Sequence, residues 1–146
     1  MNGPRFVIDA NVCIKWYLTD EALRDKAEAV LNDFMGGGVE ILAPTLLIYE
    51  LMNGLWVASR MRRIEFGNIE RSVQRVLDLG FGLHDASQFF PAVLRMSQRF
   101  GRSAYDASYL ALAEREGIQL LTGDRRLYNA VRGRLEWVIW LGSYPA

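Results

Sequence analysis

The sequence predicts a three-layer α/β/α domain built on a central, mainly parallel sheet of four to five strands. Short apolar runs alternate along the chain with segments whose apolar residues recur at helical spacing, which is typical of α/β proteins. The chain has 146 residues, of which 51% are hydrophobic, and this is enough to bury one core without disulfide bonds. We therefore expect a single domain over residues 1–146.

The expected strands are short runs rich in β-branched or other large apolar residues, bounded by turn-forming residues. They lie at residues 6–8, 40–43, 81–83, 119–122 and 137–141. Because a helix separates each strand from the next, right-handed crossovers should make the strands parallel and cover both faces of the sheet. In such sheets the ligand site lies outside the carboxyl ends of the strands.

The expected helices are marked by start and stop residues. Asn11 is the expected N-cap of the first helix, Gly36 to Gly38 end the second, Pro44 begins the third, and Asp85 caps the fifth. The later helices are expected at about 20–35, 44–60, 64–79, 86–100, 104–116 and 124–131.

Charge and cysteine content exclude few functions. The formal net charge is zero, so no overall field would attract a polyanion. The chain has 15 arginines and only two lysines, Lys15 and Lys26. Arginine suits phosphate oxygens, but a bias in the base composition of the genome explains the excess of arginine equally well. Cys13 is the only cysteine, which excludes an intrachain disulfide.

The sequence contains no apolar stretch of about 20 residues and no basic-then-apolar leader. We therefore expect a cytoplasmic protein with no membrane contact.

Three aspartates are candidate site residues, although each also has a structural explanation. Asp9 follows the first strand and could be a turn residue. Asp124 could be the N-cap of the helix after Thr122 and Gly123. Asp106 lies three residues after Ser103, which is the spacing of a capping box.

Glu50 argues for a site by itself. It is the only charged residue between Thr45 and Ser59, on a segment that is apolar on nearly every side and is therefore expected to be buried. A buried, unpaired carboxylate costs several kcal/mol unless it is protonated or given a cation. The helix dipole would return only about 0.3–1 kcal/mol of that cost.

A divalent cation would resolve the repulsion among four gathered carboxylates. Two like charges about 4 Å apart repel by about 4 kcal/mol at an effective dielectric constant of 20. Oxygen ligands, with one cysteine and one histidine in the chain, favour Mg²⁺ or Mn²⁺ over zinc. Such ions can promote phosphodiester cleavage, so a nuclease is chemically sensible.

Four blocks, in this order, resemble the PIN domains and, within them, the VapC-type toxin ribonucleases of bacterial toxin–antitoxin pairs. They cover nearly the whole chain. The blocks are residues 7–11 with 15–18 (VIDAN, KWYL), 44–55 (PTLLIYELMNGL), 105–113 (YDASYLALA) and 120–127 (LLTGDRRL).

The resemblance implies a metal-dependent endoribonuclease. Asp9, Glu50, Asp106 and Asp124 would be the acidic quartet that binds Mg²⁺ or Mn²⁺, and Asn11 and Thr122 would support them by hydrogen bonding. It also implies an RNA substrate, homodimerisation and inhibition by a small antitoxin that enters the active-site groove.

Two other readings stay open at this point. One is a receiver-type signalling domain, which also combines a parallel sheet with an acidic Mg²⁺ pocket. Receiver domains, like phosphatases of the haloacid dehalogenase type, need a lysine late in the chain. Both lysines of this chain precede residue 27, which disfavours these two families. A PIN-like module that binds RNA or a protein partner without cutting it is the third reading. The complete acidic quartet disfavours this last one.

Overall fold

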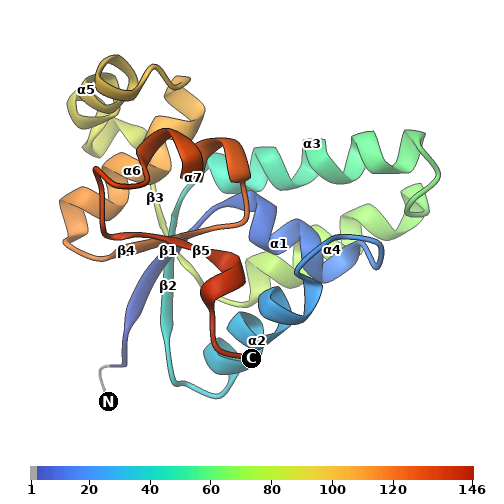
Figure 1. Ribbon diagram of the computed structural model, residues 1–146. Helices are drawn as coiled ribbons and strands as arrows, with labels where there is room; N and C mark the ends of the chain where they lie inside the picture. Colours follow the sequence, from blue (N-terminus) through green and yellow to red (C-terminus); the bar gives the residue numbers. More distant parts are fainter. Residues whose placement is uncertain (1–2) are drawn as a thin grey trace.

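The computed structural model describes residues 3–146 and contains a sheet of five parallel strands in the order β3-β2-β1-β4-β5 (Figure 1). The strands are β1 (Arg5–Ile8), β2 (Glu40–Pro44), β3 (Gly82–His84), β4 (Gln119–Thr122) and β5 (Val138–Trp140). The predicted fold class is confirmed. The strand order also excludes the receiver-type reading, since flavodoxin-like domains of that type have the order 2-1-3-4-5.

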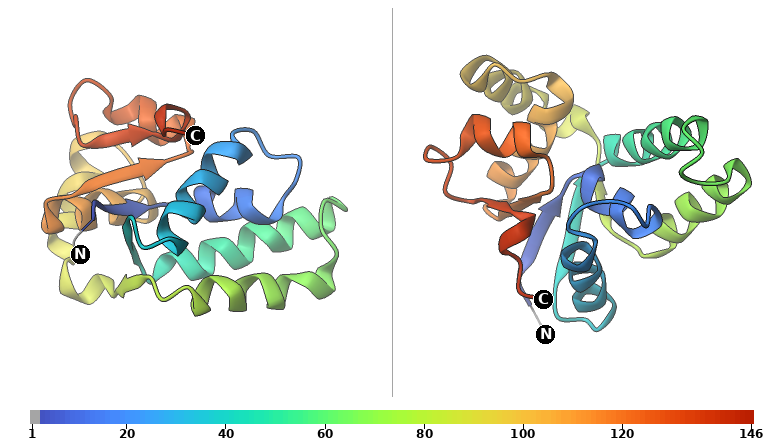
Figure 2. Two further views of the ribbon diagram at one scale, coloured as in Figure 1. Left: turned by 90° about the horizontal axis from the view of Figure 1, so that it is seen from below. Right: turned by 45° about the vertical axis from the view of Figure 1, so that its right-hand side comes forward.

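Helices cover both faces of the sheet, as right-handed crossovers require. On one face lie α1 (Ala10–Tyr17), α2 (Arg24–Met35), α3 (Leu46–Arg60) and α4 (Ile69–Asp78). On the other lie α5 (Phe90–Phe100), α6 (Ala104–Glu116) and α7 (Arg125–Val131) (Figures 1 and 2). Short 3₁₀ turns occur at Phe66–Asn68, Ala86–Gln88 and Leu141–Ser143.

The centre of the core is formed by β1, β4 and α6. Val7 and Ile8 of β1 and Leu120 and Leu121 of β4 are fully buried. Every residue of α6 from 107 to 113 is also buried, because this helix lies between the sheet and α5. The two central strands therefore hold the residues that follow them at fixed positions.

The first corrections concern helix starts. Asp9, not Asn11, is the N-cap of α1, and its side chain accepts a hydrogen bond from the Val12 backbone N–H. Pro44 ends β2 instead of starting a helix, and α3 begins at Leu46. Proline tolerates both positions, so the sequence could not decide between them.

Three other predicted helices are shorter than expected. Helix α2 begins at Arg24, four residues later than predicted. The segments predicted at 64–79 and 86–100 each contain a 3₁₀ turn before α4 and α5. Asp85 caps the second of these turns by accepting a hydrogen bond from the Ser87 N–H.

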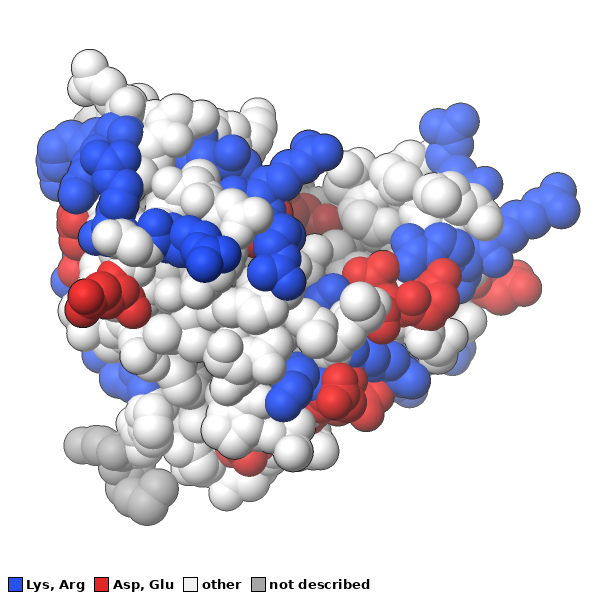
Figure 3. Space-filling view, viewed as in Figure 1, with Lys and Arg blue, Asp and Glu red and all other residues white. Residues whose placement is uncertain are grey.

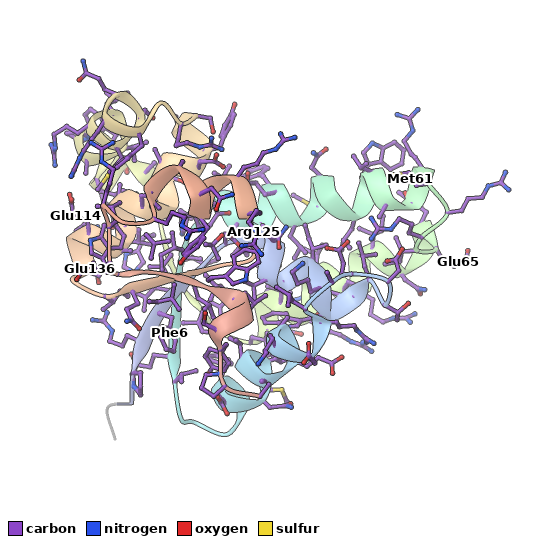
Figure 4. All side chains as sticks on the ribbon, viewed as in Figure 1. Phe6, Met61, Glu65, Glu114, Arg125 and Glu136 are labelled. Atoms are coloured by element: carbon purple, nitrogen blue, oxygen red, sulfur yellow. The ribbon has the colours of Figure 1, made fainter. Side chains whose placement is uncertain are left out.

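The prediction that α3 is buried on all sides is wrong. Helices α3 and α4 form an antiparallel hairpin that extends away from the sheet, and Met61 and Glu65 lie at its outer end (Figures 2 and 4). One side of α3 is buried through Leu47, Leu51, Leu55 and Ala58. The other side exposes large apolar side chains: Tyr49, Met52, Trp56 and Val57.

Gly54 lets α1 approach α3 closely. A Cβ atom added at Gly54 would lie 2.5 Å from Cδ1 of Ile14 on α1, too close for a real contact. This approach fixes α3 against the helix that follows β1. No helix in the described part of the chain, residues 3–146, is both long and apolar enough to cross a membrane.

Candidate active site

The carboxyl ends of β1 and β4 form the switch point of the sheet. These strands are neighbours, but α1 leaves β1 toward one face and α7 leaves β4 toward the other. The diverging connections leave a crevice between them, which is where open α/β sheets bind ligands. Asp9 directly follows β1, and Asp124 lies two residues after β4.

A pocket of about 430 Å³ occupies this position, and all four predicted carboxylates line it: Asp9, Glu50, Asp106 and Asp124. Helix α3 brings Glu50 from one face of the sheet, and α6 brings Asp106 from the other. In the space-filling view, acidic atoms lie in a hollow with Lys and Arg side chains on both sides of it (Figure 3). Four residues that are far apart in the sequence thus share one cavity.

Asp9 is the most deeply buried of the four, with 5% of its surface exposed. One carboxylate oxygen accepts the Val12 N–H at 3.2 Å, and the other accepts the Thr122 hydroxyl. Burial raises the pKa of Asp9 to about 7, and the charges of Asp124 and Glu50 act in the same direction. The two hydrogen bonds lower it but do not offset the burial.

Glu50 is half-buried and has a hydrogen-bond partner, so the description of it as buried and unpaired is wrong. The Tyr109 hydroxyl of α6 donates to Glu50 Oε1 at 2.5 Å. Burial raises the pKa of Glu50, and the charges of Asp106 and Asp124 raise it further. The energetic conflict inferred from the sequence is present, but it arises from neighbouring carboxylates as well as from burial.

Asp106 is held by Arg102, which lies just before the start of α6. Arg102 Nη2 lies 2.8 Å from Asp106 Oδ2, and Arg102 Nε donates to the same oxygen at 3.2 Å. Ser103 caps α6 by accepting the backbone N–H of Asp106 at 3.1 Å. The capping therefore uses the backbone of Asp106, and its second carboxylate oxygen stays available.

Asp124 caps α7, as its position suggested. One of its oxygens accepts the backbone N–H groups of Arg126 and Leu127. Thr122 accepts the Asp124 N–H at 3.0 Å while its own hydroxyl donates to Asp9. Thr122 thus links the residues that follow β1 and β4.

Asn11 lines the same pocket, but its side-chain oxygen is buried without a hydrogen-bond partner. Gly123 is needed beside it, since a Cβ at that position would collide with the Asn11 oxygen and lie 3.0 Å from Cε of Lys15. An unpartnered buried oxygen costs free energy unless a ligand satisfies it. This oxygen and the carboxylates form a donor set that suits a hard divalent cation.

The carboxylates line the pocket without being converged on one point. Within residues 3–146, no three histidine, cysteine, aspartate or glutamate side chains are already grouped as metal ligands. Asp9 is turned toward Thr122, Asp106 toward Arg102, and Asp124 toward its own helix. Side-chain rotations would be needed to aim them at a common ion.

Sequence reasoning missed several residues around the carboxylates. Arg102 lies before the start of α6, so no helical spacing pairs it with Asp106 in the sequence. Tyr109 lies on α6 one turn after Asp106, but its contact with Glu50 of α3 depends on tertiary packing. Tyr49 and Tyr105, which also line the pocket, carry no signal that distinguishes them from core residues.

Comparisons with known proteins found related sequences. A family model described as "PIN domain" matches residues 6–133. Exonuclease VapC9 of Pyrobaculum aerophilum is 35% identical over 91 residues, which cover 62% of this chain and 67% of that protein. Ribonuclease VapC3 of the same organism is 28% identical over 126 residues, covering 84% of this chain and 92% of that protein.

Solved structures resemble the fold. The protein PAE2754 from Pyrobaculum aerophilum superposes with a TM-score of 0.68 at 26% identity, covering 95% of this chain and 85% of that one. A toxin–antitoxin complex from Klebsiella pneumoniae contains a chain with a TM-score of 0.65 at 18% identity, covering 91% of this chain and 94% of that one. At that identity the second likeness concerns the fold alone.

Proposed function

Since the chain belongs to the PIN-domain family, we propose that it is a metal-dependent endoribonuclease that acts as the toxin of a toxin–antitoxin pair. One observation carries the proposal: Asp9, Glu50, Asp106 and Asp124 line a single pocket at the switch point of the sheet. The relatives named as nucleases support the same chemistry. We expect the protein to act in the cytoplasm, where RNA substrates are present.

We assign the four carboxylates as ligands of Mg²⁺ or Mn²⁺, with the Asn11 oxygen as a further polar group of the site. When bound, such an ion supplies charge stabilisation for phosphodiester hydrolysis and lowers the pKa of a water molecule. The protein's own residues then position the donors. Thr122 orients Asp9, and Tyr109 orients Glu50.

Arginines next to the pocket suit the phosphate backbone. Arg125 and Arg126 are exposed and directly follow Asp124, and Arg125 lies at the start of α7 (Figure 4). The guanidinium of Arg125 lies 4.0 Å from the centre of the Trp140 ring, which limits its motion. A polyanion could therefore approach the acidic pocket although the net charge of the chain is zero.

The metal requirement tests the catalytic proposal. A circular single-stranded RNA should stay intact when the purified protein is assayed in EDTA, and should be opened when Mg²⁺ or Mn²⁺ is added in excess. Gel electrophoresis distinguishes the circle from its products, and a circle has no ends for an exonuclease to use. Cleavage in EDTA would contradict the metal mechanism, whereas degradation of linear RNA alone would make the protein an exonuclease.

Two protein partners belong to the proposal. Beyond the acidic pocket, the exposed apolar side of α3 continues along the hairpin through Met52, Trp56 and Val57, and suits an amphipathic antitoxin segment. An apolar hollow next to the acidic pocket shares Leu46 and Tyr105 with it and includes Phe90 and Leu94 of α5, which are 56% and 60% exposed. We assign the side of this hollow formed by Phe90 and Leu94 to contact with a second copy of the chain in a homodimer.

Arg102 is expected to compete with the metal for Asp106. In Arg102→Gln the carboxylate loses its ion pair and a nearby positive charge, so Mn²⁺ should bind up to about fivefold more tightly, given the ~0–1 kcal/mol typical of exposed pairs. Isothermal titration calorimetry measures this without any substrate. Arg99→Gln is the matched control, because Arg99 lies against the Phe100 ring. Unchanged or weaker binding in Arg102→Gln would contradict the competition.

A further inference from the structure

Two exposed tyrosines stand at the mouth of the acidic pocket. Tyr49 is 68% exposed and Tyr105 is 63% exposed, and both line the pocket. Each directly precedes a carboxylate of the site: Tyr49 comes before Glu50 on α3, and Tyr105 comes before Asp106 on α6. Because α3 and α6 lie on opposite faces of the sheet, the two rings belong to opposite walls of the pocket.

The other four tyrosines of the chain have structural contacts. Tyr109 and Tyr144 donate hydrogen bonds to Glu50 and Asp33, and Tyr128 packs against the Trp140 ring. Tyr17 is half-buried against the core. Within residues 3–146, Tyr49 and Tyr105 make no aromatic pair, no cation–π contact and no side-chain hydrogen bond.

Three other aromatic side chains are exposed: Phe90 lines the apolar hollow beside α5, while Trp56 and Phe66 contact each other. Trp56 and Phe66 pack edge to face at 5.9 Å near the tip of the hairpin, and Arg60 lies 5.9 Å from the Trp56 ring. A single exposed aromatic residue needs no explanation. An explanation is needed for two unpartnered rings that lie on opposite walls of one acidic pocket.

The charges around the rings favour a nucleic acid over a protein at this position. An apolar protein segment laid across the mouth would remove water from four carboxylates, which costs several kcal/mol. Bases and sugars leave the floor accessible to cations, while Arg102 and Arg125 offer donors for phosphates. Nucleobases also present flat π-faces that stack on tyrosine whatever the base.

We propose that Tyr49 and Tyr105 stack on the two nucleobases that flank the phosphate to be cut, one on each wall of the pocket. These residues then determine specificity: they bind RNA whose bases are unstacked at the cleavage point, as in loops and single strands. Paired bases in an A-form helix are stacked on each other and cannot turn their faces to the protein. The assignment rests on the proposed nuclease function, because the phosphate between the two bases must lie over the carboxylates.

Binding of a labelled single-stranded RNA in EDTA, measured by fluorescence anisotropy, tests the stacking apart from cleavage. Tyr49→Ala and Tyr105→Ala should each weaken binding by about tenfold or more, as expected for one lost stacked base. Tyr49→Phe and Tyr105→Phe should stay within about twofold of the wild type, because the ring remains. Phe66→Ala is the matched control; Phe66 is 67% exposed, does not line the acidic pocket, and should bind RNA as the wild type does. Binding of a duplex of the same sequence should be equal in all variants.

The assignment would be overturned by wild-type binding in both alanine variants, by failure of phenylalanine to preserve binding, or by absence of RNA binding by the wild type. A lower mass of the alanine variants in sedimentation would also overturn it, since the rings would then serve contact between copies. If RNA binding depends on the rings but no metal ion permits cleavage, the nuclease function fails and the stacking stands. If cleavage proceeds and the alanine variants bind RNA normally, the nuclease function stands and the stacking assignment fails.

Discussion

The Asp9→Asn variant is expected to lose RNA cleavage, yet to unfold less readily than the wild type when no metal is present. Asparagine has the same size as aspartate, is an equally good N-cap and can still accept the Val12 N–H. It cannot supply the negative charge that holds a cation. Several kcal/mol of charge stabilisation would be lost, so activity should fall by about 10³-fold or more.

The stability part of this prediction follows from the raised pKa of Asp9. The pKa is about 7 in the folded protein, while the ordinary value is 3.8, so ionisation is penalised by burial. Below about pH 4 the carboxyl group is protonated in both states and no penalty exists. The penalty grows as the pH rises from 4 to 7 and is complete above 7, where it reaches at most roughly 4 kcal/mol.

Urea denaturation in EDTA at pH 4.5 and pH 8 measures this difference. Asp9→Asn should exceed the wild type in free energy of unfolding by more at pH 8 than at pH 4.5. Saturating Mn²⁺ should then stabilise the wild type and leave the variant little changed, since a ligand stabilises the state that binds it. Asp78→Asn, an exposed substitution on α4, is the control for both assays. Cleavage at the wild-type rate by Asp9→Asn would contradict the site.

The positions of Asp9 and Asp124 were predictable from the sequence because both follow short buried strands. A strand end is a local feature, and parallel strands bring their carboxyl ends to one edge of the sheet. The register of β1 beside β4 then places the two residues together, although they lie more than 100 positions apart. No comparable local signal sets the partners of Glu50 and Asp106, which depend on how α3 and α6 pack.

The error at α3 has a physical cause. The sequence shows a helix that is apolar on nearly every side, and burial inside the same chain is the usual explanation. Here four of those side chains are exposed on a hairpin that extends from the sheet, and one of them, Trp56, is 46% exposed. A single sequence does not distinguish apolar residues that bind a partner from apolar residues that pack in the core. The same error made Glu50 look more isolated than it is.

The Asp106→Asn variant should also lose cleavage by about 10³-fold or more, but here without a change in stability. Asp106 is half-buried, and its ion pair with Arg102 is partly exposed, so the pair contributes only ~0–1 kcal/mol to folding. The Ser103 cap of α6 uses the Asp106 backbone and persists in the variant. The Asp106→Asn substitution should therefore change catalysis without changing stability, whereas Asp9→Asn should change both.

Measurements of Mn²⁺ affinity and of the urea midpoint complete the test of Asp106→Asn. Mn²⁺ should bind more weakly than to the wild type, and adding Arg102→Gln should not restore it, because the carboxylate itself is missing. The urea midpoint should match that of the wild type at pH 4.5 and pH 8. Glu114→Gln, an exposed change later on α6, controls for loss of a negative charge on the same helix. If Asp106→Asn binds Mn²⁺ and cuts RNA normally, Asp106 lines the pocket without serving as a ligand.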